Sequence, residues 1–155
     1  MSLIGKTLPA FSLLDDQGTI VTNADFKGHW IVLYAYPKDS TPGCTTEACD
    51  FRDRNAALKK LGAKIYGISR DAMKSHQNFI AKQNLTFPLL SDPDTALLKP
   101  LGAFGKKIMY GKEVLGIIRS TFLVDPEGVI RHVWPKVRVK DHAEEVLAVL
   151  KELKK

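Results

Sequence analysis

The sequence predicts an α/β fold, and three observations predict it. An apolar run rich in β-branched and aromatic residues, Trp30 to Tyr36, is followed by a helical segment from Thr41 to about Leu61 and by a second apolar run, Ala63 to Ser69. Gly62 is typical of a helix end, and the short link that it forms makes a β-α-β unit with parallel strands. Later in the chain, two apolar runs flank the turn sequence Asp125 to Gly128, which predicts a β-hairpin before a last helix.

The other elements follow in chain order. Residues 10–14 and 19–21 are predicted to pair as short antiparallel strands around a turn at 15–18. A helix is predicted over 72–84, followed by a short edge strand at 87–92, a brief helix at 94–99 and a loop with some strand over 102–115. The hairpin is predicted to consist of strands 117–124 and 129–134, and the last helix is predicted to start at Asp141. Alternating strands and helices, then a hairpin and a helix, is the order of a thioredoxin-like fold with an N-terminal extension. We therefore expect a central mixed sheet flanked by helices.

Length and composition exclude several classes of protein. A chain of 155 residues predicts one domain over 1–155, which can bury a core without cross-links, so its two cysteines do not indicate a secreted disulfide scaffold. Residues 1–6 show no charged leader before an apolar segment, and no apolar stretch of about 18 residues occurs. We expect no membrane partner and a reducing compartment, the cytoplasm. The net charge is +6, but the basic residues are scattered, so nucleic acid is not an expected partner.

Cys44 is the first candidate for chemistry. Thr41 is a good N-cap and Pro42 suits the first helical position, so Cys44 falls in the first turn of the predicted helix. Unpaired backbone N–H groups and the positive end of the helix dipole favour a thiolate there, and the thiolate is the reactive form. Free cysteines are also among the most buried residues. The local pattern alone therefore leaves a reactive and an inert Cys44 equally open.

Cys49 lies five residues further on the same helix. Five residues of regular helix give about 140° of rotation and about 7.5 Å of rise, so the two Cα atoms are about 8.6 Å apart. A disulfide needs less than about 7 Å. If the two cysteines are a redox couple, the start of the helix must unwind in each cycle. The alternative is two independent cysteines on one helix. Cys44 shares an apolar stripe with Ala48, Phe51, Leu58 and Leu61, whereas Cys49 lies off that stripe.

Two segments resemble a known family. The spacing Pro37-x-x-x-Thr41-x-x-Cys44 is similar to the active-site signature of the peroxiredoxins, and Tyr36 to Arg52 is similar to the subgroup called bacterioferritin comigratory protein or peroxiredoxin Q. Arg119 to Gly128 resembles the family's strand that carries its active-site arginine. The resemblance runs over nearly the whole chain. It implies the same thioredoxin-like fold and a thiol peroxidase that reduces hydrogen peroxide and organic hydroperoxides.

The resemblance also implies a role for each site residue. Cys44 attacks the peroxide and becomes a sulfenic acid, and Cys49 condenses with it to an intramolecular disulfide. On pattern alone, Arg119 shares one strand face with Ile117, Thr121 and Leu123 and is more often a surface residue. By resemblance it faces the thiolate, which it stabilises, and binds the peroxide oxygens together with the Thr41 hydroxyl.

Pro37 completes the implied site by shielding the pocket from water. A thioredoxin-type dithiol is the implied reductant, and a monomer is expected because the couple lies within one chain. No metal or organic cofactor is expected, since the four histidines show no ligand spacing with each other or with the cysteines. Glu47 could touch the pocket, but a carboxylate one turn from a helix cap is more often there because the helix dipole favours it. Asp39 is interpreted as a loop residue.

Two other functions stay open. A disulfide exchanger of the thioredoxin type would normally carry Cys-x-x-Cys, whereas four residues separate Cys44 and Cys49 here. A non-catalytic binding module would have slow thiols that peroxide leaves unchanged. The preferred peroxide depends on the shape of the pocket and is not predicted.

Overall fold

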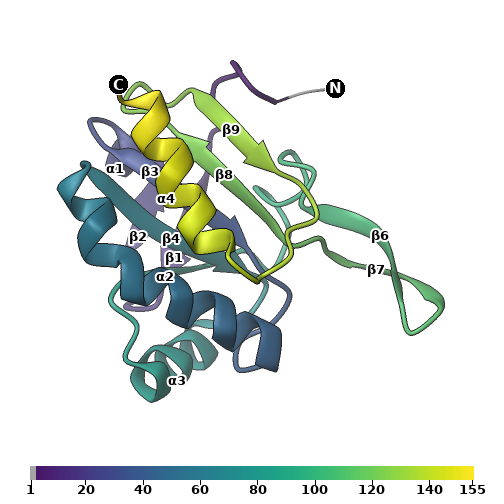
Figure 1. Cartoon of the computed structure of the whole chain (residues 1–155). Coiled ribbons are helices and arrows are strands. Elements are labelled where there is room, and N and C mark those ends of the chain that lie inside the picture. The colour runs from purple at the N-terminus through teal and green to yellow at the C-terminus, as the bar shows by residue number, and fades with distance from the viewer. Residues whose placement is uncertain (1–2) are drawn as a thin grey trace.

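The computed structural model describes residues 3–155, and its centre is a seven-stranded mixed sheet with the strand order β2-β1-β5-β4-β3-β8-β9 (Figure 1). The predicted α/β fold is confirmed. The predicted domain boundary and the predicted lack of a leader include residues 1 and 2, which lie outside the described residues.

The predicted β-α-β unit forms the middle of the molecule. Strand β3 (Trp30–Ala35) pairs in parallel with β4 (Ala63–Ser69), and helix α2 (Pro42–Lys60) connects them. All six residues of β3 are buried, as an apolar run covered on both faces requires. Gly62, at φ +80°, follows the end of α2 in the left-handed conformation that glycine adopts without strain.

The N-terminal strands correct one prediction. Strands β1 (Ser12–Asp15) and β2 (Ile20–Thr22) pair antiparallel as expected, and the short helix α1 (Asn23–Phe26) follows them. Strand β5 (Leu89–Ser91) is not an edge strand, as residues 87–92 were predicted to be. It lies between β4, to which it is parallel, and β1, to which it is antiparallel. The N-terminal extension therefore covers the edge that β5 would otherwise present.

The brief helix predicted at residues 94–99 was wrong, because the segment forms successive turns. The buried carboxylate of Asp92 accepts hydrogen bonds from the backbone N–H groups of Ala96, Leu97 and Leu98 at 2.8–2.9 Å. The Asp92 side chain thus fixes the backbone of these turns.

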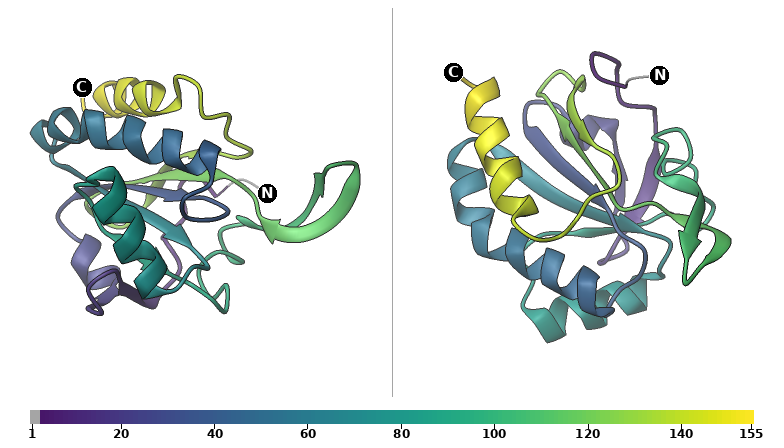
Figure 2. Two further views of the ribbon diagram at one scale, coloured as in Figure 1. Left: turned by 90° about the horizontal axis from the view of Figure 1, so that it is seen from below. Right: turned by 45° about the vertical axis from the view of Figure 1, so that its right-hand side comes forward.

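The two faces of the sheet are covered differently. Helices α2, α3 (Met73–Gln83) and α4 (His142–Leu153) lie on one face, where their apolar side chains pack with Val32, Tyr34 and Leu123 of the sheet (Figure 2). The other face is covered by α1, the N-terminal segment and the turns around residues 97–103. Cys44 belongs to the core on the α2 face.

A two-stranded hairpin projects from this body (Figure 1). Residues 102–115, predicted as a loop with some strand, contribute β6 (Phe104–Met109) and most of β7 (Lys112–Ile117). The predicted strand 117–124 is therefore two strands, because β7 ends at Ile117 and β8 (Ser120–Val124) begins three residues later. Strand β9 (Ile130–Trp134) completes the predicted second hairpin by pairing with β8.

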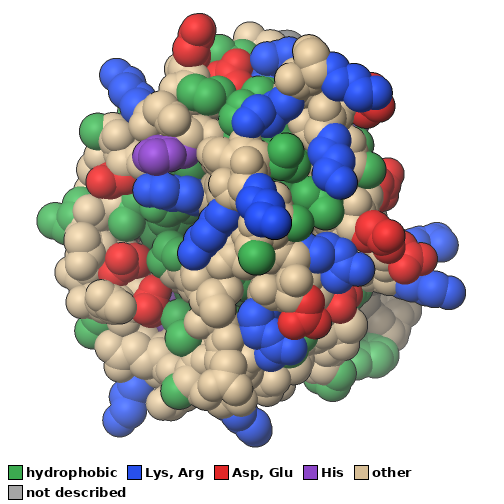
Figure 3. All heavy atoms as spheres, turned by 60° about the vertical axis from the view of Figure 1, so that its left-hand side comes forward, with side chains coloured by type: hydrophobic (Ala, Val, Ile, Leu, Met, Phe, Trp, Pro, Cys, Tyr) green, Lys and Arg blue, Asp and Glu red, His purple; other side chains and the backbone are tan. Residues whose placement is uncertain are grey.

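Charged side chains are mixed on the surface. On the face drawn in Figure 3, lysine and arginine side chains alternate with acidic and apolar ones and form no continuous basic stripe. Among residues 3–155, no helix combines the length and the apolar character that crossing a bilayer requires.

Candidate active site

The loop after β3 places Cys44 at the start of α2. Thr41 occupies the N-cap position with an extended backbone, Pro42 is the first helical residue, and the Thr45 N–H donates to the Thr41 carbonyl at 2.8 Å. These positions confirm the predicted helix start. The Thr41 side chain makes no cap, however, because its hydroxyl donates to the Lys38 carbonyl at 2.8 Å. The Thr41 side chain therefore stabilises a turn within the loop before α2.

Cys44 is a buried free thiol beside a fixed cation. Its side chain is 1% exposed, and the Arg119 Nη2 atom donates a hydrogen bond to the Cys44 Sγ at 3.3 Å. Cys44 is also the third residue of α2, where helical N–H groups lack helical partners. The guanidinium and the helix N-terminus both favour negative charge on this sulfur.

Arg119 does not lie in a strand, which corrects its predicted setting. It lies in the two-residue link between β7 and β8, and its carbonyl accepts from the Val137 N–H at 2.7 Å. Leaving the strand frees the side chain from the alternation of a sheet, so that it reaches α2. A Cβ atom on Gly43 would lie 3.3 Å from the Arg119 Nη2, so the glycine leaves room for the guanidinium.

Glu47 is the second partner of Arg119, and its role differs from the interpretation made from the sequence. Its side chain is 1% exposed, and its Oε1 accepts from the Arg119 Nη1 at 2.5 Å, while its Oε2 is buried without a partner. Burial raises the pKa of Glu47 to about 7, and the ion pair with Arg119 offsets this only in part. The sequence offered a signal for this role, because Glu47 lies three residues after Cys44 and therefore on the same, buried side of α2.

Cys49 lies apart from Cys44 and Arg119, on the side of α2 that meets the end of α3. Its half-buried thiol donates to the Gln83 Oε1 at 3.6 Å, and the Arg52 Nη1 donates to the Gln83 carbonyl at 2.5 Å. Both cysteines are free and α2 is continuous between them. The separation inferred for a regular helix, about 8.6 Å between Cα atoms, therefore holds.

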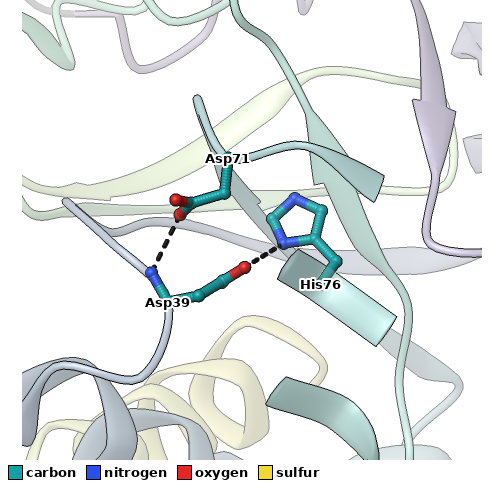
Figure 4. Close-up of side chains that lie close together, drawn as sticks. All are labelled: Asp39, Asp71 and His76. Atoms are coloured by element: carbon teal, nitrogen blue, oxygen red, sulfur yellow. Dashed lines mark hydrogen bonds and ion pairs between the residues drawn. The ribbon is translucent and has the colours of Figure 1, made fainter. Parts of the chain in front are cut away.

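A buried polar cluster holds the loop from the other side. Asp39, Asp71 and His76 approach one another beneath the loop (Figure 4). The Asp39 carboxylate accepts from the Tyr36 hydroxyl at 2.5 Å and from the Ser75 hydroxyl at 2.9 Å, and its Oδ2 lies 2.7 Å from the His76 Nδ1. The Asp39 N–H donates to the Asp71 Oδ2 at 2.8 Å. The cluster thus ties the loop before Cys44 to α3 and to the end of β4.

Within the described part of the chain, the same three residues are the one group whose donor atoms are close enough to hold a metal ion. The His76 Nε2 contacts the Leu90 carbonyl at 3.1 Å, so this nitrogen carries a proton. The short contact of Nδ1 with Asp39 also needs a proton between its two atoms. Because the ligand atoms already hydrogen-bond one another and their neighbours, we interpret the cluster as a clasp on the loop.

The structure brings two of the five predicted site residues into contact, Cys44 and Arg119. Thr41 and Pro37 lie in the adjoining loop and are partly buried, and Cys49 is on the same helix but outside the pocket. Sequence reasoning considered a contact of Glu47 with the site but favoured a role in the helix dipole, and it missed the Asp39–His76 pair. His76 gave no signal, because a single histidine in a helix has no spacing to interpret.

The chain matches known proteins over nearly its whole length. The model of the AhpC/TSA family matches residues 4–133. The Peroxiredoxin Bcp of Xanthomonas campestris pv. campestris is 56% identical over 134 residues, which cover 86% of this chain and 84% of the relative. The Peroxiredoxin Bcp of Bacillus subtilis is 48% identical over 150 residues, which cover 97% and 96%.

Solved structures agree with these relatives. One of the Xanthomonas campestris bacterioferritin comigratory protein, described for its alkyl peroxide reduction activity, superposes with a TM-score of 0.90 at 50% identity and covers 100% of this chain and 98% of that one. A variant of the Xylella fastidiosa PrxQ superposes with a TM-score of 0.92 at 43% identity, covering 98% and 97%. The thioredoxin-like architecture expected from the order of elements is confirmed.

Proposed function

Because the chain belongs to the AhpC/TSA family, and its relatives over nearly the whole length are peroxiredoxins of the Bcp and PrxQ group, we propose that Cys44 is its peroxide-reacting residue. The activity is that of a thiol peroxidase, with a hydroperoxide as substrate and a thiol as reductant. The single observation that carries the assignment of Cys44 is the 3.3 Å hydrogen bond that its sulfur accepts from Arg119 at the start of α2.

In the first step, the Cys44 thiolate attacks the terminal oxygen of the hydroperoxide. The S–O bond forms as the O–O bond breaks, and the leaving oxygen takes a proton to become water or an alcohol. Negative charge moves from sulfur to the leaving oxygen, so a cation that contacts both positions lowers the barrier. Arg119 and the first N–H groups of α2 are the donors near Cys44. The Thr41 hydroxyl donates its hydrogen to the Lys38 carbonyl and can accept a hydrogen bond from the O–H of the hydroperoxide. Pro37 limits the entry of water.

Glu47 orients Arg119 in this scheme. Its Oε1 takes the Nη1 end of the guanidinium, which leaves the Nη2 end for the sulfur. A paired guanidinium has fewer orientations available than a free one, so the donor is in position before the peroxide arrives. Glu47 is thus a positioning residue that acts through Arg119.

In the second step, the Cys49 thiol condenses with the Cys44 sulfenic acid, which forms the disulfide and releases water. The two Cα atoms are too far apart while α2 is intact, so its first turns unwind. Unwinding releases Cys49 from Gln83 and the loop from its contacts with Asp71 and His76. A thioredoxin-type dithiol then reduces the disulfide by thiol exchange, and α2 reforms. We extend the proposal to a monomer that acts in the cytoplasm.

One peptide tests these roles. Trypsin releases residues 39–52, which contain both cysteines and no internal lysine or arginine. After one equivalent of hydrogen peroxide, mass spectrometry should show this peptide lighter by two hydrogens, and no alkylation by iodoacetamide. An unchanged mass would support the binding module instead.

Two variants separate the roles of the cysteines. Cys49→Ser should accumulate a sulfenic acid at Cys44, seen as a dimedone adduct on the same peptide. Cys44→Ser should consume no peroxide but fold normally, since serine is close to cysteine in size. A sulfenic acid on Cys49 in place of Cys44 would reverse the assignment. A disulfide exchanger would keep its activity on a disulfide substrate without any need for peroxide.

A further inference from the structure

A buried pair of side chains, Asp39 and His76, holds the loop before Cys44 against α3. The two side chains are 2% and 0% exposed, and the Asp39 Oδ2 lies 2.7 Å from the His76 Nδ1 (Figure 4). The other ring nitrogen, Nε2, lies 3.1 Å from the Leu90 carbonyl of β5, so the imidazole is fixed at both nitrogens. His76 therefore connects the loop to the central sheet through contacts that water does not reach.

The other partners of Asp39 also lie outside the segment that unwinds. Its carboxylate accepts from the Tyr36 hydroxyl at 2.5 Å and from the Ser75 hydroxyl at 2.9 Å, and its N–H donates to the Asp71 Oδ2 at 2.8 Å. A buried carboxylate is stable only where hydrogen bonds replace its contacts with water. When the loop leaves, the buried tyrosine and histidine lose their acceptor, which opposes unwinding.

Ser40, the next residue in the chain, has the opposite effect. Its φ is +64°, a left-handed conformation that costs energy for a residue with a Cβ atom. Its two neighbours hold it there, because Asp39 is fixed by the contacts above and the Thr41 hydroxyl donates to the Lys38 carbonyl at 2.8 Å. Unwinding frees Ser40 to adopt an ordinary conformation. The contacts of Asp39 thus favour the folded loop, and the backbone of Ser40 favours the unwound one.

We propose that His76 is a positioning residue of the reaction, which acts through Asp39 and against the strain at Ser40 to set how often the start of α2 unwinds. Since Cys49 reaches Cys44 only in the unwound state, His76 thereby sets the rate at which the disulfide forms. This role rests on the proposed function, because it belongs to the second step of that reaction. His76 itself touches none of the reacting atoms.

The Cys44 sulfenic acid has two fates that report on this rate. In the folded pocket its sulfur attacks a second molecule of hydrogen peroxide: a second S–O bond forms, the O–O bond breaks, the leaving oxygen takes a proton to become water, and the sulfur becomes a sulfinic acid. In the unwound state the Cys49 sulfur attacks the Cys44 sulfur: the S–S bond forms, the S–O bond breaks, and the hydroxyl leaves as water. Only the first fate becomes faster as the peroxide concentration rises.

The test measures the crossover concentration, the concentration of hydrogen peroxide at which the two products are equal. Reduced protein is oxidised without a reductant, and the tryptic peptide 39–52 is weighed: the disulfide has lost two hydrogens and the sulfinic acid has gained two oxygens. His76→Gln should raise the crossover concentration about tenfold, because a buried hydrogen bond to a charged group is weakened. Quenched-flow samples at low peroxide should show the disulfide forming faster by the same factor.

Three further variants keep the test independent of how well His76→Gln folds. Ser75→Ala and Tyr36→Phe each remove one donor to Asp39 and should raise the crossover concentration about threefold. Ser40→Gly should lower it about threefold, because glycine adopts the left-handed conformation without strain and so stabilises the folded loop. A change in opposite directions distinguishes control of unwinding from a general loss of stability.

Asn23→Ala is the matched control, because Asn23 lies in α1 on the opposite face of the sheet and its Oδ1 accepts from the Phe11 N–H at 2.8 Å. It should lower the stability but leave the crossover concentration unchanged. An unchanged value in Ser75→Ala and Tyr36→Phe, or an equal rise in Asn23→Ala, would overturn the role of His76. If peroxide leaves the peptide of the unchanged protein without either product, the proposed function fails. If the disulfide forms at one rate in every variant, only the role of His76 fails.

Discussion

Replacing Glu47 by glutamine should change how stability depends on pH. Burial raises the folded-state pKa of Glu47 from 4.5 to about 7. Between these values the native state binds a proton that the unfolded state has lost, so the free energy of unfolding falls as pH rises. A shift of about 2.5 units at 1.36 kcal/mol per unit corresponds to a loss on the order of 3 kcal/mol. Glutamine keeps an acceptor for Arg119 but does not ionise, so the variant should not show this loss.

The measurement has to separate Glu47 from His142, which titrates over the same range in the opposite sense. Burial lowers the pKa of His142 from 6.5 to about 4, so its contribution to stability is lost as pH falls through this window. We therefore expect the effect in the difference between Glu47→Gln and the unchanged protein. Urea unfolding of the reduced protein at half-unit steps from pH 4 to pH 8 should give a difference that moves by about 3 kcal/mol in favour of the variant.

Glu127→Gln is a suitable control, since Glu127 is exposed in the turn between β8 and β9. The difference in free energy of unfolding between this variant and the unchanged protein should stay constant from pH 4 to pH 8. A flat difference for Glu47→Gln as well would show that Glu47 ionises as it does in water, and would refute the argument from burial. A difference of the opposite slope would mean that the Arg119 ion pair outweighs burial.

Three further predictions concern single positions. Arg119→Met should lower kcat/KM for hydrogen peroxide by at least about tenfold, because one charged donor to the reacting atoms is lost; stopped-flow kinetics with an unchanged rate would contradict this. Gly67→Ala should lower the free energy of unfolding by about 1–3 kcal/mol, since its Cβ would lie 2.7 Å from Leu89 Cδ2, and a neutral result in urea would show that Leu89 moves freely. His142→Asn should not show the loss of stability with falling pH that we attribute to protonation of His142. If thermal melts near pH 5 show the same loss for the variant as for the unchanged protein, the histidine is not its source.

The sequence predicted the elements whose pattern is local. The apolar run at Trp30, the Pro42 helix start and Gly62 each depend on neighbouring residues, and the β-α-β unit formed as predicted. One error came from a contact between distant residues. The apparent edge strand β5 is covered by β1, more than seventy residues earlier in the chain. The turns after β5 have a local cause, since the buried Asp92 carboxylate accepts hydrogen bonds from three backbone N–H groups four to six residues later.

For the candidate site, too, the sequence predicted what depends on neighbouring residues better than what depends on distant contacts. Helix position and spacing made Cys44 and Cys49 candidates, and the resemblance to a known family gave them their predicted roles. Arg119 was identified by resemblance, but its place between two strands was not, because alternation cannot show where a strand stops. Glu47 was misjudged because a carboxylate near a helix start has a common explanation on the surface. The 2.5 Å contact between the buried Glu47 and the partly buried Arg119 shows that they pair.

The link between β7 and β8 has a consequence for the speed of recycling. Arg119 is anchored by its carbonyl bond to Val137 in the segment after β9, whereas Cys44 belongs to the segment that must open. The cation thus stays in place while the sulfur departs and returns, and only one or two helical turns have to reform. Such turns reform within about a microsecond, far faster than the 1–10³ turnovers per second typical of enzymes. Resetting the pocket should therefore never limit the cycle, and encounter with the reductant should set its pace.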